Sequence, residues 1–202
     1  MAQGLRHLNG NCLCVVDTET TGTVPGHHEV YQIAILPLGP DLKPMKGVIP
    51  FYQDLAIHYP ERIDKNAIKM NRQEFAQKQQ RALDPFTAAD LLDDWFERLR
   101  LPIYKRLCPM AQNWPFDREF LKAWIGNESF DHLFSPWYRD TMVITQFHSD
   151  LCDHRSDRIM FPQHNLQFIS QKLDVKNLKP HDALQDCITT AEVYRRLLLL
   201  FA

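Results

Sequence analysis

CLCVVDTETTG, at residues 12–22, opens as a continuous apolar run and closes with two acidic residues and a Thr-Thr-Gly break. An apolar run without alternation indicates a strand that is buried on both faces of a sheet. Because side chains alternate along a strand, Asp17 and Glu19 lie on one side and Thr18 points to the other. Two carboxylates at the end of a buried strand are costly unless a cation binds them, and oxygen ligands suit Mg²⁺ and Mn²⁺. Taken alone, such a pair also fits a strand that ends in solvent.

The remaining segments predict a mixed sheet with helices on its faces. Strands are expected at about residues 30–38, 47–52, 107–111 and 137–139, with Pro109 placing the third of these at an edge or a bulge. Helices are expected at 72–81, 87–99 with Thr87 as cap, 114–124, 141–148, 166–173 and 183–201, with a short turn at 67–70 and a loop over 150–162. This order fits an α/β fold in one domain covering residues 1–202.

Composition limits the class of protein. The chain has 202 residues, 45% of them hydrophobic and 24% charged, as in a globular protein. A net charge of −2 argues against broad electrostatic capture of duplex nucleic acid, although a nuclease can bind one strand end in a local site. No apolar stretch long enough to span a membrane and no signal peptide are visible, so a cytoplasmic location is expected. The five cysteines are expected to be buried, reduced thiols.

A third acidic residue follows the predicted strand at 107–111. Asn113 is suited to cap a helix and Pro115 to its first turn, which places Asp117 on the apolar face of that helix. A carboxylate on an apolar face needs a partner. That partner is either a bound cation or a buried hydrogen-bond donor from the backbone or an arginine.

The last constellation is PHDALQD at residues 180–186. Asp182 and Gln185 have the spacing of a capping box, so the final helix begins there. Asp186 falls near the first turn of this helix, where the helix dipole favours negative charge. His181 lies just outside the helix, where a loop could bring it to the same site as Asp186. By itself, His181 is also compatible with an ordinary surface histidine.

Together these segments resemble the three motifs of the DEDD 3′→5′ exonucleases, histidine subclass, of the ribonuclease H-like superfamily. The resemblance rests on VVDTETTG at residues 15–22, on NWPFDREFL at 113–121 and on His181, Ala183 and Asp186. Residues 63–71 resemble a linking segment of proofreading-type members. Gln32 stands where many members carry Glu, and Gln112 stands where His often precedes the Asn.

The resemblance implies a five-stranded sheet, with strands one to three antiparallel and strands four and five parallel to the first. It also implies two divalent cations, Mg²⁺ or Mn²⁺. Asp17, Glu19 and Asp186 would hold the first cation, and Asp17 and Asp117 the second. His181 would act as the general base on the attacking water. Four carboxylates in one pocket repel one another, which two cations would relieve.

Residues near these motifs are candidates for binding the strand end. Thr20, Thr21 and Gly22 follow the first motif, and small residues there let backbone amides approach a terminal nucleotide. Asn113 and Trp114 precede Asp117; Trp114 is placed to stack a base or to fill the core. His27 and His28 are interpreted as ordinary loop histidines, and Asp140 as structural.

The expected substrate is the 3′ end of a single-stranded nucleic acid, hydrolysed to nucleoside 5′-monophosphates. The proofreading-like segment favours DNA over RNA, and an exoribonuclease or oligoribonuclease is the alternative. A function of another class is a non-catalytic nucleic-acid-binding module or a polymerase-docking subunit. The presence of all four carboxylates and the histidine argues against loss of catalysis, and nothing in the sequence supports a protein partner.

Overall fold

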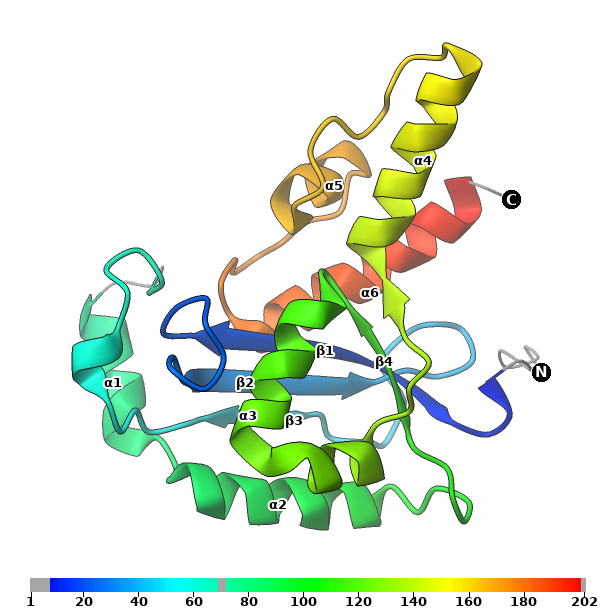
Figure 1. The fold of residues 1–202 in the computed structure, drawn as a ribbon. Coiled ribbons are helices and arrows are strands. Elements are labelled where there is room, and N and C mark those ends of the chain that lie inside the picture. The colour runs from blue at the N-terminus through cyan, green and yellow to red at the C-terminus, as the bar shows by residue number, and fades with distance from the viewer. Residues whose placement is uncertain (1–7, 69–71, 201–202) are drawn as a thin grey trace.

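A computed structural model describes residues 8–68 and 72–200 of the chain. In this part of the chain, five strands form one sheet in the order β3-β2-β1-β4-β5 (Figure 1). The strands are β1 (Cys12–Thr20), β2 (Val30–Pro37), β3 (Phe51–Asp54), β4 (Leu107–Ala111) and β5 (Arg139–Asp140). β1, β2 and β3 pair antiparallel, whereas β4 pairs parallel with both β1 and β5. The predicted ribonuclease H-like mixed sheet is confirmed.

Seven helical segments surround the sheet in the described residues. They are η2 (Pro60–Arg62), α1 (Arg72–Arg81), α2 (Pro85–Arg98), α3 (Trp114–Leu133), α4 (Thr141–Arg155), α5 (Leu166–Lys172) and α6 (Ala183–Leu200). Residues 69–71 of the proofreading-like segment lie outside the described residues, and so do residues 69 and 70 of the expected turn. Phe201 of the expected last helix also lies outside them. None of the described helices combines the length and apolarity needed to cross a membrane.

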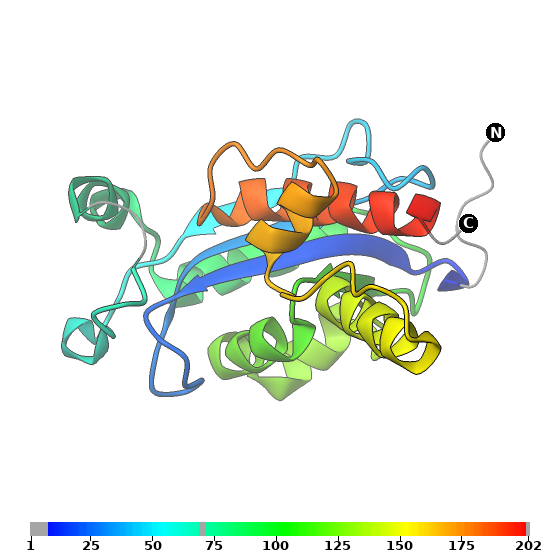
Figure 2. The ribbon, with the colours of Figure 1, turned by 90° about the horizontal axis from the view of Figure 1, so that it is seen from above.

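Burial on both faces explains why β1 is continuously apolar. Leu13 and Val15 pack toward α6, while Cys14 and Val16 belong to the core formed with α2 and α3. Figure 2 shows α6 on one side of the sheet and α3 and α4 on the other. Since β1 lies at the centre of the sheet, its carboxyl end can be reached by helices from both faces.

Pro109 was expected at an edge or a bulge, and this expectation is wrong. β4 lies between β1 and β5, and Pro109 is in regular register with Cys14. On the β5 side, pairing is limited to an isolated bridge at Leu107 and to the stretch starting at Met110. Pro109 falls between these two points, so its missing N–H interrupts no ladder there.

Several other boundaries differ from expectation, among them β5, which covers Arg139–Asp140 and not 137–139. α2 begins at Pro85, because the Asp84 carboxylate caps it by accepting from the amide of Phe86; Thr87 is inside the helix. α4 continues to Arg155, through the first part of the expected loop, and ends where Ser156 adopts a left-handed conformation. β3 covers 51–54 rather than 47–52, since residues 47–50 are not in a strand.

α3 is longer than the predicted helix at 114–124. It runs to Leu133, with a break at Gly126, where φ is 80° and ψ is 161°. An L side chain rarely adopts this conformation, so glycine permits the bend. Phe130 and Leu133, beyond the break, return to the core beside β4.

Candidate active site

The carboxyl end of β1 supplies the first two acidic residues. The alternation of β1 places Asp17 and Glu19 on the α6 side, and Thr18 on the α3 side. The Glu19 carboxylate accepts a hydrogen bond of 3.3 Å from the hydroxyl of Tyr31 on β2. This bond orients Glu19 from the neighbouring strand.

Asp117 approaches the same strand end from α3. Its side chain is only 3% exposed, and its Oδ1 accepts from the backbone N–H (2.9 Å) and the hydroxyl (2.7 Å) of Thr18. The buried partner expected for this carboxylate is therefore Thr18, the residue between the two acids of β1. These bonds fix Asp117 beside Asp17. Burial raises the pKa of Asp17, and the negative charge of Asp117 raises it further.

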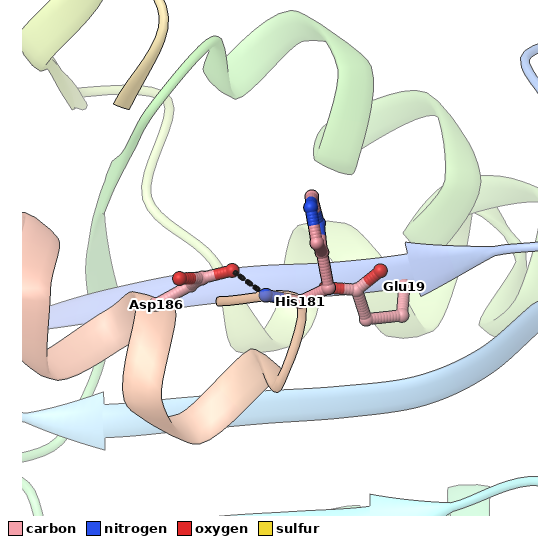
Figure 3. Close-up of side chains that lie close together, drawn as sticks. All are labelled: Glu19, His181 and Asp186. Atoms are coloured by element: carbon pink, nitrogen blue, oxygen red, sulfur yellow. Dashed lines mark hydrogen bonds between the residues drawn. The ribbon is translucent and has the colours of Figure 1, made fainter. Parts of the chain in front are cut away.

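Asp186 and His181 arrive from the third segment. The carboxylate of Asp186 accepts from the backbone N–H of His181 (3.0 Å) and from the side-chain amide of Asn177 (2.6 Å). His181 has a φ of 65° in the loop before α6. Ligand atoms of Glu19, His181 and Asp186 all lie within 4.8 Å of one another, and Figure 3 shows the three residues together beside β1.

The electrostatics show how closely these acids are grouped. Burial raises the pKa of Asp17 well above its usual range, and the charges of Asp117 and Glu19 raise it further. Burial, followed by the charge of Asp186, raises the pKa of Glu19 to about 7. Burial likewise raises the pKa of Asp117 to about 7, against the opposing hydrogen bonds from Thr18. Such carboxyls favour protons when no cation is bound.

Asp182, next to His181, is held from the opposite side. Its carboxylate accepts from the hydroxyl of Tyr52 on β3 (2.9 Å) and from Lys179 (3.2 Å), and lies 3.6 Å from Lys78 of α1. It also accepts from the amide of Gln185 at 3.3 Å, as the predicted cap requires. The side-chain amide of Gln185 instead lies 3.5 Å from Thr189, so only half of the predicted capping box forms.

Gln32, fully buried on β2, joins this network to the sheet. Its amide nitrogen donates to Asp54 (2.5 Å) and to the Tyr52 hydroxyl (3.1 Å). Its amide oxygen accepts from the backbone N–H of Ala183 at 2.9 Å. One glutamine thus connects β3 with the first residue of α6. A carboxylate at position 32 could not donate to Asp54, which is a physical reason for Gln at this position.

A cavity of about 330 Å³ opens beside these acids. The residues lining it are Thr18, Glu19, Thr20, Gly22, Thr23, Asp64, Asn66, Ala67, Phe116 and His181. Sequence reasoning missed Asp64, Asn66 and Phe116 as lining residues. Phe116 directly precedes Asp117, so its place in the motif was a usable signal. Asp64 is brought here by a backbone hydrogen bond from its N–H to the carbonyl of Thr21 (2.8 Å), which no local pattern reveals.

The predicted strand-end residues divide into two groups. Thr20 and Gly22 line the cavity, whereas Thr21 is fully buried and exchanges hydrogen bonds with Glu29. A Cβ at Gly22 would overlap the imidazole of His28, so glycine is needed there for packing. His28 in turn accepts from the amide of Val24 at 3.0 Å, which fixes the loop after β1.

Two expectations at the start of α3 need correction. Trp114 is 2% exposed and its ring packs against Phe130 and Phe134, so it fills the core and has no face for a base. Asn113 occupies the N-cap position in a left-handed conformation, but its side chain makes no cap bond. The amides of both residues are instead bound by the Asp140 carboxylate, at 3.1 and 2.8 Å, which confirms that Asp140 is structural.

The donor set fits hard divalent cations. Carboxylate oxygens and an imidazole from β1, α3 and the α6 region converge, and burial holds the acids at raised proton affinity. Mg²⁺ and Mn²⁺ prefer oxygen ligands and would replace those protons. Ligand atoms of Glu19, His181 and Asp186 lie within 4.8 Å of one another, and the charges of Glu19, Asp117 and Asp186 all act on the buried Asp17.

Comparison with known proteins agrees with this fold. The RNase T family model, described as exonuclease, matches residues 14–194. The chain therefore belongs to the RNase T exonuclease family, the DEDD family recognised from its motifs. No curated protein sequence matches the chain.

Several solved nucleases share the fold at low identity. Cell-death related nuclease 4 superposes with a TM-score of 0.70 at 16% identity, over 94% of this chain and 64% of that one. Exonuclease I of E. coli, in complex with a dT13 oligonucleotide, gives 0.67 at 16% identity, over 95% and 42%. The nuclease domain of 3′hExo, a DEDDh member bound to rAMP, gives 0.59 at 15%, over 94% and 92%. The chain thus spans less than two thirds of the first of these proteins and less than half of the second.

Proposed function

We propose that this protein is a metal-dependent 3′→5′ exonuclease that removes nucleoside 5′-monophosphates from single-stranded nucleic acid. The observation that carries the proposal is the meeting of Asp17, Asp117 and Asp186 at one strand end. They come from three distant segments, and each has a pKa raised by burial. Carboxylates grouped in this way beside a cavity indicate a site for cations and a phosphodiester.

Two divalent cations, when bound, would neutralise the carboxylates and stabilise the attacking and leaving oxygens of an in-line displacement. The protein's own groups do the rest. Glu19 is oriented by Tyr31, and Asp117 by Thr18, so both acids are fixed before substrate arrives. His181, exposed at the mouth of the cavity, is placed to take the proton of the attacking water.

Hydrolysis transfers the terminal phosphoryl group from the strand to water. The water oxygen bonds to the terminal phosphorus as the bond from phosphorus to the 3′ oxygen of the preceding nucleotide breaks. One proton of the water passes to His181, the 3′ oxygen takes up a proton from the solvent, and the shortened strand leaves with a free 3′ hydroxyl. The cavity lined by Thr20, Gly22 and Phe116 would hold the released nucleotide.

DNA is the favoured substrate and RNA the alternative. Residues 63–68 of the proofreading-like segment line or adjoin the cavity through Asp64 and Asn66. Support from solved structures is divided. Exonuclease I was crystallised with DNA oligomers, whereas 3′hExo was crystallised with rAMP and a 3′-exonuclease recognises the 3′ end of a histone mRNA stem-loop.

The deciding experiment uses matched DNA and RNA oligomers labelled at either end, with Mg²⁺ or Mn²⁺. We expect 3′-labelled strands to release labelled mononucleotide immediately and 5′-labelled strands to give a descending ladder of products. Both reactions should be faster on DNA than on RNA. Oligomers with a single terminal ribonucleotide isolate the effect of the 2′ hydroxyl. Internal products would overturn the exonuclease proposal. Oligomer binding without any hydrolysis would instead favour the non-catalytic module.

A further inference from the structure

A second cavity, also of about 330 Å³, lies beside the active-site cavity. Its walls are the loop at residues 26–30, the segment around Tyr59 and Arg62, the start of α2 at Phe86, and the side of α3 at Phe120 and Trp124. None of the four acidic residues assigned above lines it. It is therefore a separate site that needs its own explanation.

The two cavities share their dividing walls. Gly22 and Thr23 line the first cavity, and Gly26 and the following residues of the same loop line the second. On α3, Phe116 lines the first cavity and Phe120 the second, with ring centroids 4.8 Å apart. Neighbouring residues of one loop and successive turns of one helix therefore line both cavities.

The lining of the second cavity suits an unpaired nucleotide. The guanidinium of Arg62 lies 3.8 Å from the centroid of the Tyr59 ring, and Tyr59 remains 45% exposed. Phe86 is 78% exposed at the first turn of α2. Exposed aromatic rings stack bases without regard to sequence, and guanidinium groups bind phosphates. The loop histidines His27 and His58 also line this cavity.

Glu29, which lines this cavity, and the nearby acids Asp84 and Glu61 are already engaged. Glu29 accepts from the backbone amides of His58 (3.0 Å) and Tyr59 (2.9 Å). Asp84 lies 3.2 Å from the His58 ring, and Glu61 lies 3.9 Å from Arg62. The Glu61 pair is exposed and weak, so a phosphate can compete for Arg62.

We infer that this second cavity is a strand-binding subsite for nucleotides on the 5′ side of the scissile phosphodiester. Bases stack on Tyr59 and Phe86, and Arg62 binds a phosphate. The subsite rests on the proposed exonuclease function and makes the enzyme prefer long single strands over the shortest substrates. Bases that are paired in a duplex cannot stack on these rings, so the subsite does not improve the binding of duplex ends.

The test compares two substrates that share the same terminal nucleotide. The p-nitrophenyl ester of thymidine 5′-monophosphate fills only the active-site cavity, whereas dT12 extends beyond it. Stacking is worth ~1–3 kcal/mol per base, which is about five- to 150-fold, so the double variant Tyr59→Ala/Phe86→Ala, which removes two rings, should raise KM for dT12 by about thirtyfold or more. Arg62→Ala should raise it by about tenfold. For both variants kcat on dT12, and kcat/KM on the ester, should stay unchanged.

Matched controls separate the subsite from general effects. Arg98→Ala removes the same charge from the far end of α2, and Tyr104→Ala removes a ring that is 95% exposed before β4. Neither should alter KM for dT12. Equal losses on both substrates, or no change on dT12, would overturn the subsite.

Failure of the proposed function is distinguishable from failure of the subsite. If the unmodified protein hydrolyses neither substrate, anisotropy of fluorescein-labelled dT12 with Ca²⁺ measures the subsite alone. Weaker binding by the Tyr59 and Arg62 variants, with the controls unchanged, would still support it. Identical binding by all proteins would reject it.

Discussion

The backbone N–H of His181 donates to the carboxylate of Asp186 over 3.0 Å, across the start of α6. Two residues five apart within one helix would point roughly 140° away from each other. The left-handed backbone at His181, with a φ of 65°, escapes this limit. The loop turns back on the first helical turn, so an imidazole and a carboxylate from one short segment serve the same site.

Removal of the central carboxylate should abolish hydrolysis without unfolding the protein. Asp17→Ala deletes the acid whose pKa is raised by burial and by its acidic neighbours, so the metal-free variant should melt at or above the temperature of the unmodified protein. Nuclease assays with Mg²⁺ or Mn²⁺ check the loss of hydrolysis, and thermal melts in EDTA check the stability of the metal-free variant. Asp157→Ala, on an exposed loop, is the control. Full activity in Asp17→Ala would remove this residue from the site.

His181 should be separable from cation binding. His181→Asn keeps a residue that tolerates the left-handed conformation and retains the backbone N–H bond to Asp186. General acid–base catalysis contributes roughly 10²- to 10⁴-fold, so the single-turnover rate should fall by that order. Mn²⁺ binding, measured by calorimetry, should change little. An unchanged rate would assign the proton transfer elsewhere.

The metal-free protein should lose stability as pH rises. Burial lifts the pKa of Asp117 from 3.8, and that of Glu19 from 4.5, to about 7 in the folded state. A raised folded pKa means that protonation stabilises the fold; this contribution is complete below about pH 4 and is lost as pH passes through about 7.

Asp117→Asn isolates this effect, because the amide oxygen can still accept from Thr18. In EDTA at pH 8 the variant should melt a few degrees above the unmodified protein, with a gap that narrows toward pH 5; roughly 1 kcal/mol shifts Tm by about 2–4 °C at this size. Mn²⁺ at pH 8 should stabilise the unmodified protein more than the variant. A gap that is constant with pH would contradict the assignment.

Replacement of Gln32 by glutamate should destabilise the protein. Gln32→Glu places a second carboxylate against Asp54 and removes the donor to Tyr52, a buried loss of about 1–3 kcal/mol. Urea unfolding at pH 7 should show it. The double variant Gln32→Glu/Asp54→Asn restores a donor–acceptor pair and should recover most of the loss. Independent, additive effects of the two changes would show that the pair does not interact.

The sequence predicted most of what local chemistry determines. The apolar run of β1, the alternation of Asp17 and Glu19, and the bend before α6 follow from periodicity and capping. What it could not supply were relationships made by tertiary packing. Trp114 has the same place in its motif whether it stacks a base or fills the core, and only its neighbours Phe130 and Phe134 decide. Pro109 was misplaced because the shortness of β5 cannot be read from β4.

The thiols of this chain provide a built-in reporter of unfolding. All five cysteines are free and buried, and Cys12, Cys14, Cys108 and Cys187 lie in the sheet or against it. Burial raises the pKa of the Cys14 and Cys187 thiols well above the usual range, so the nucleophilic thiolate is scarce while the fold is closed. Alkylation by a small electrophile should therefore proceed only as fast as the strands separate. Mass spectrometry of the labelled peptides would then time the opening of each face of the sheet, without any engineered probe.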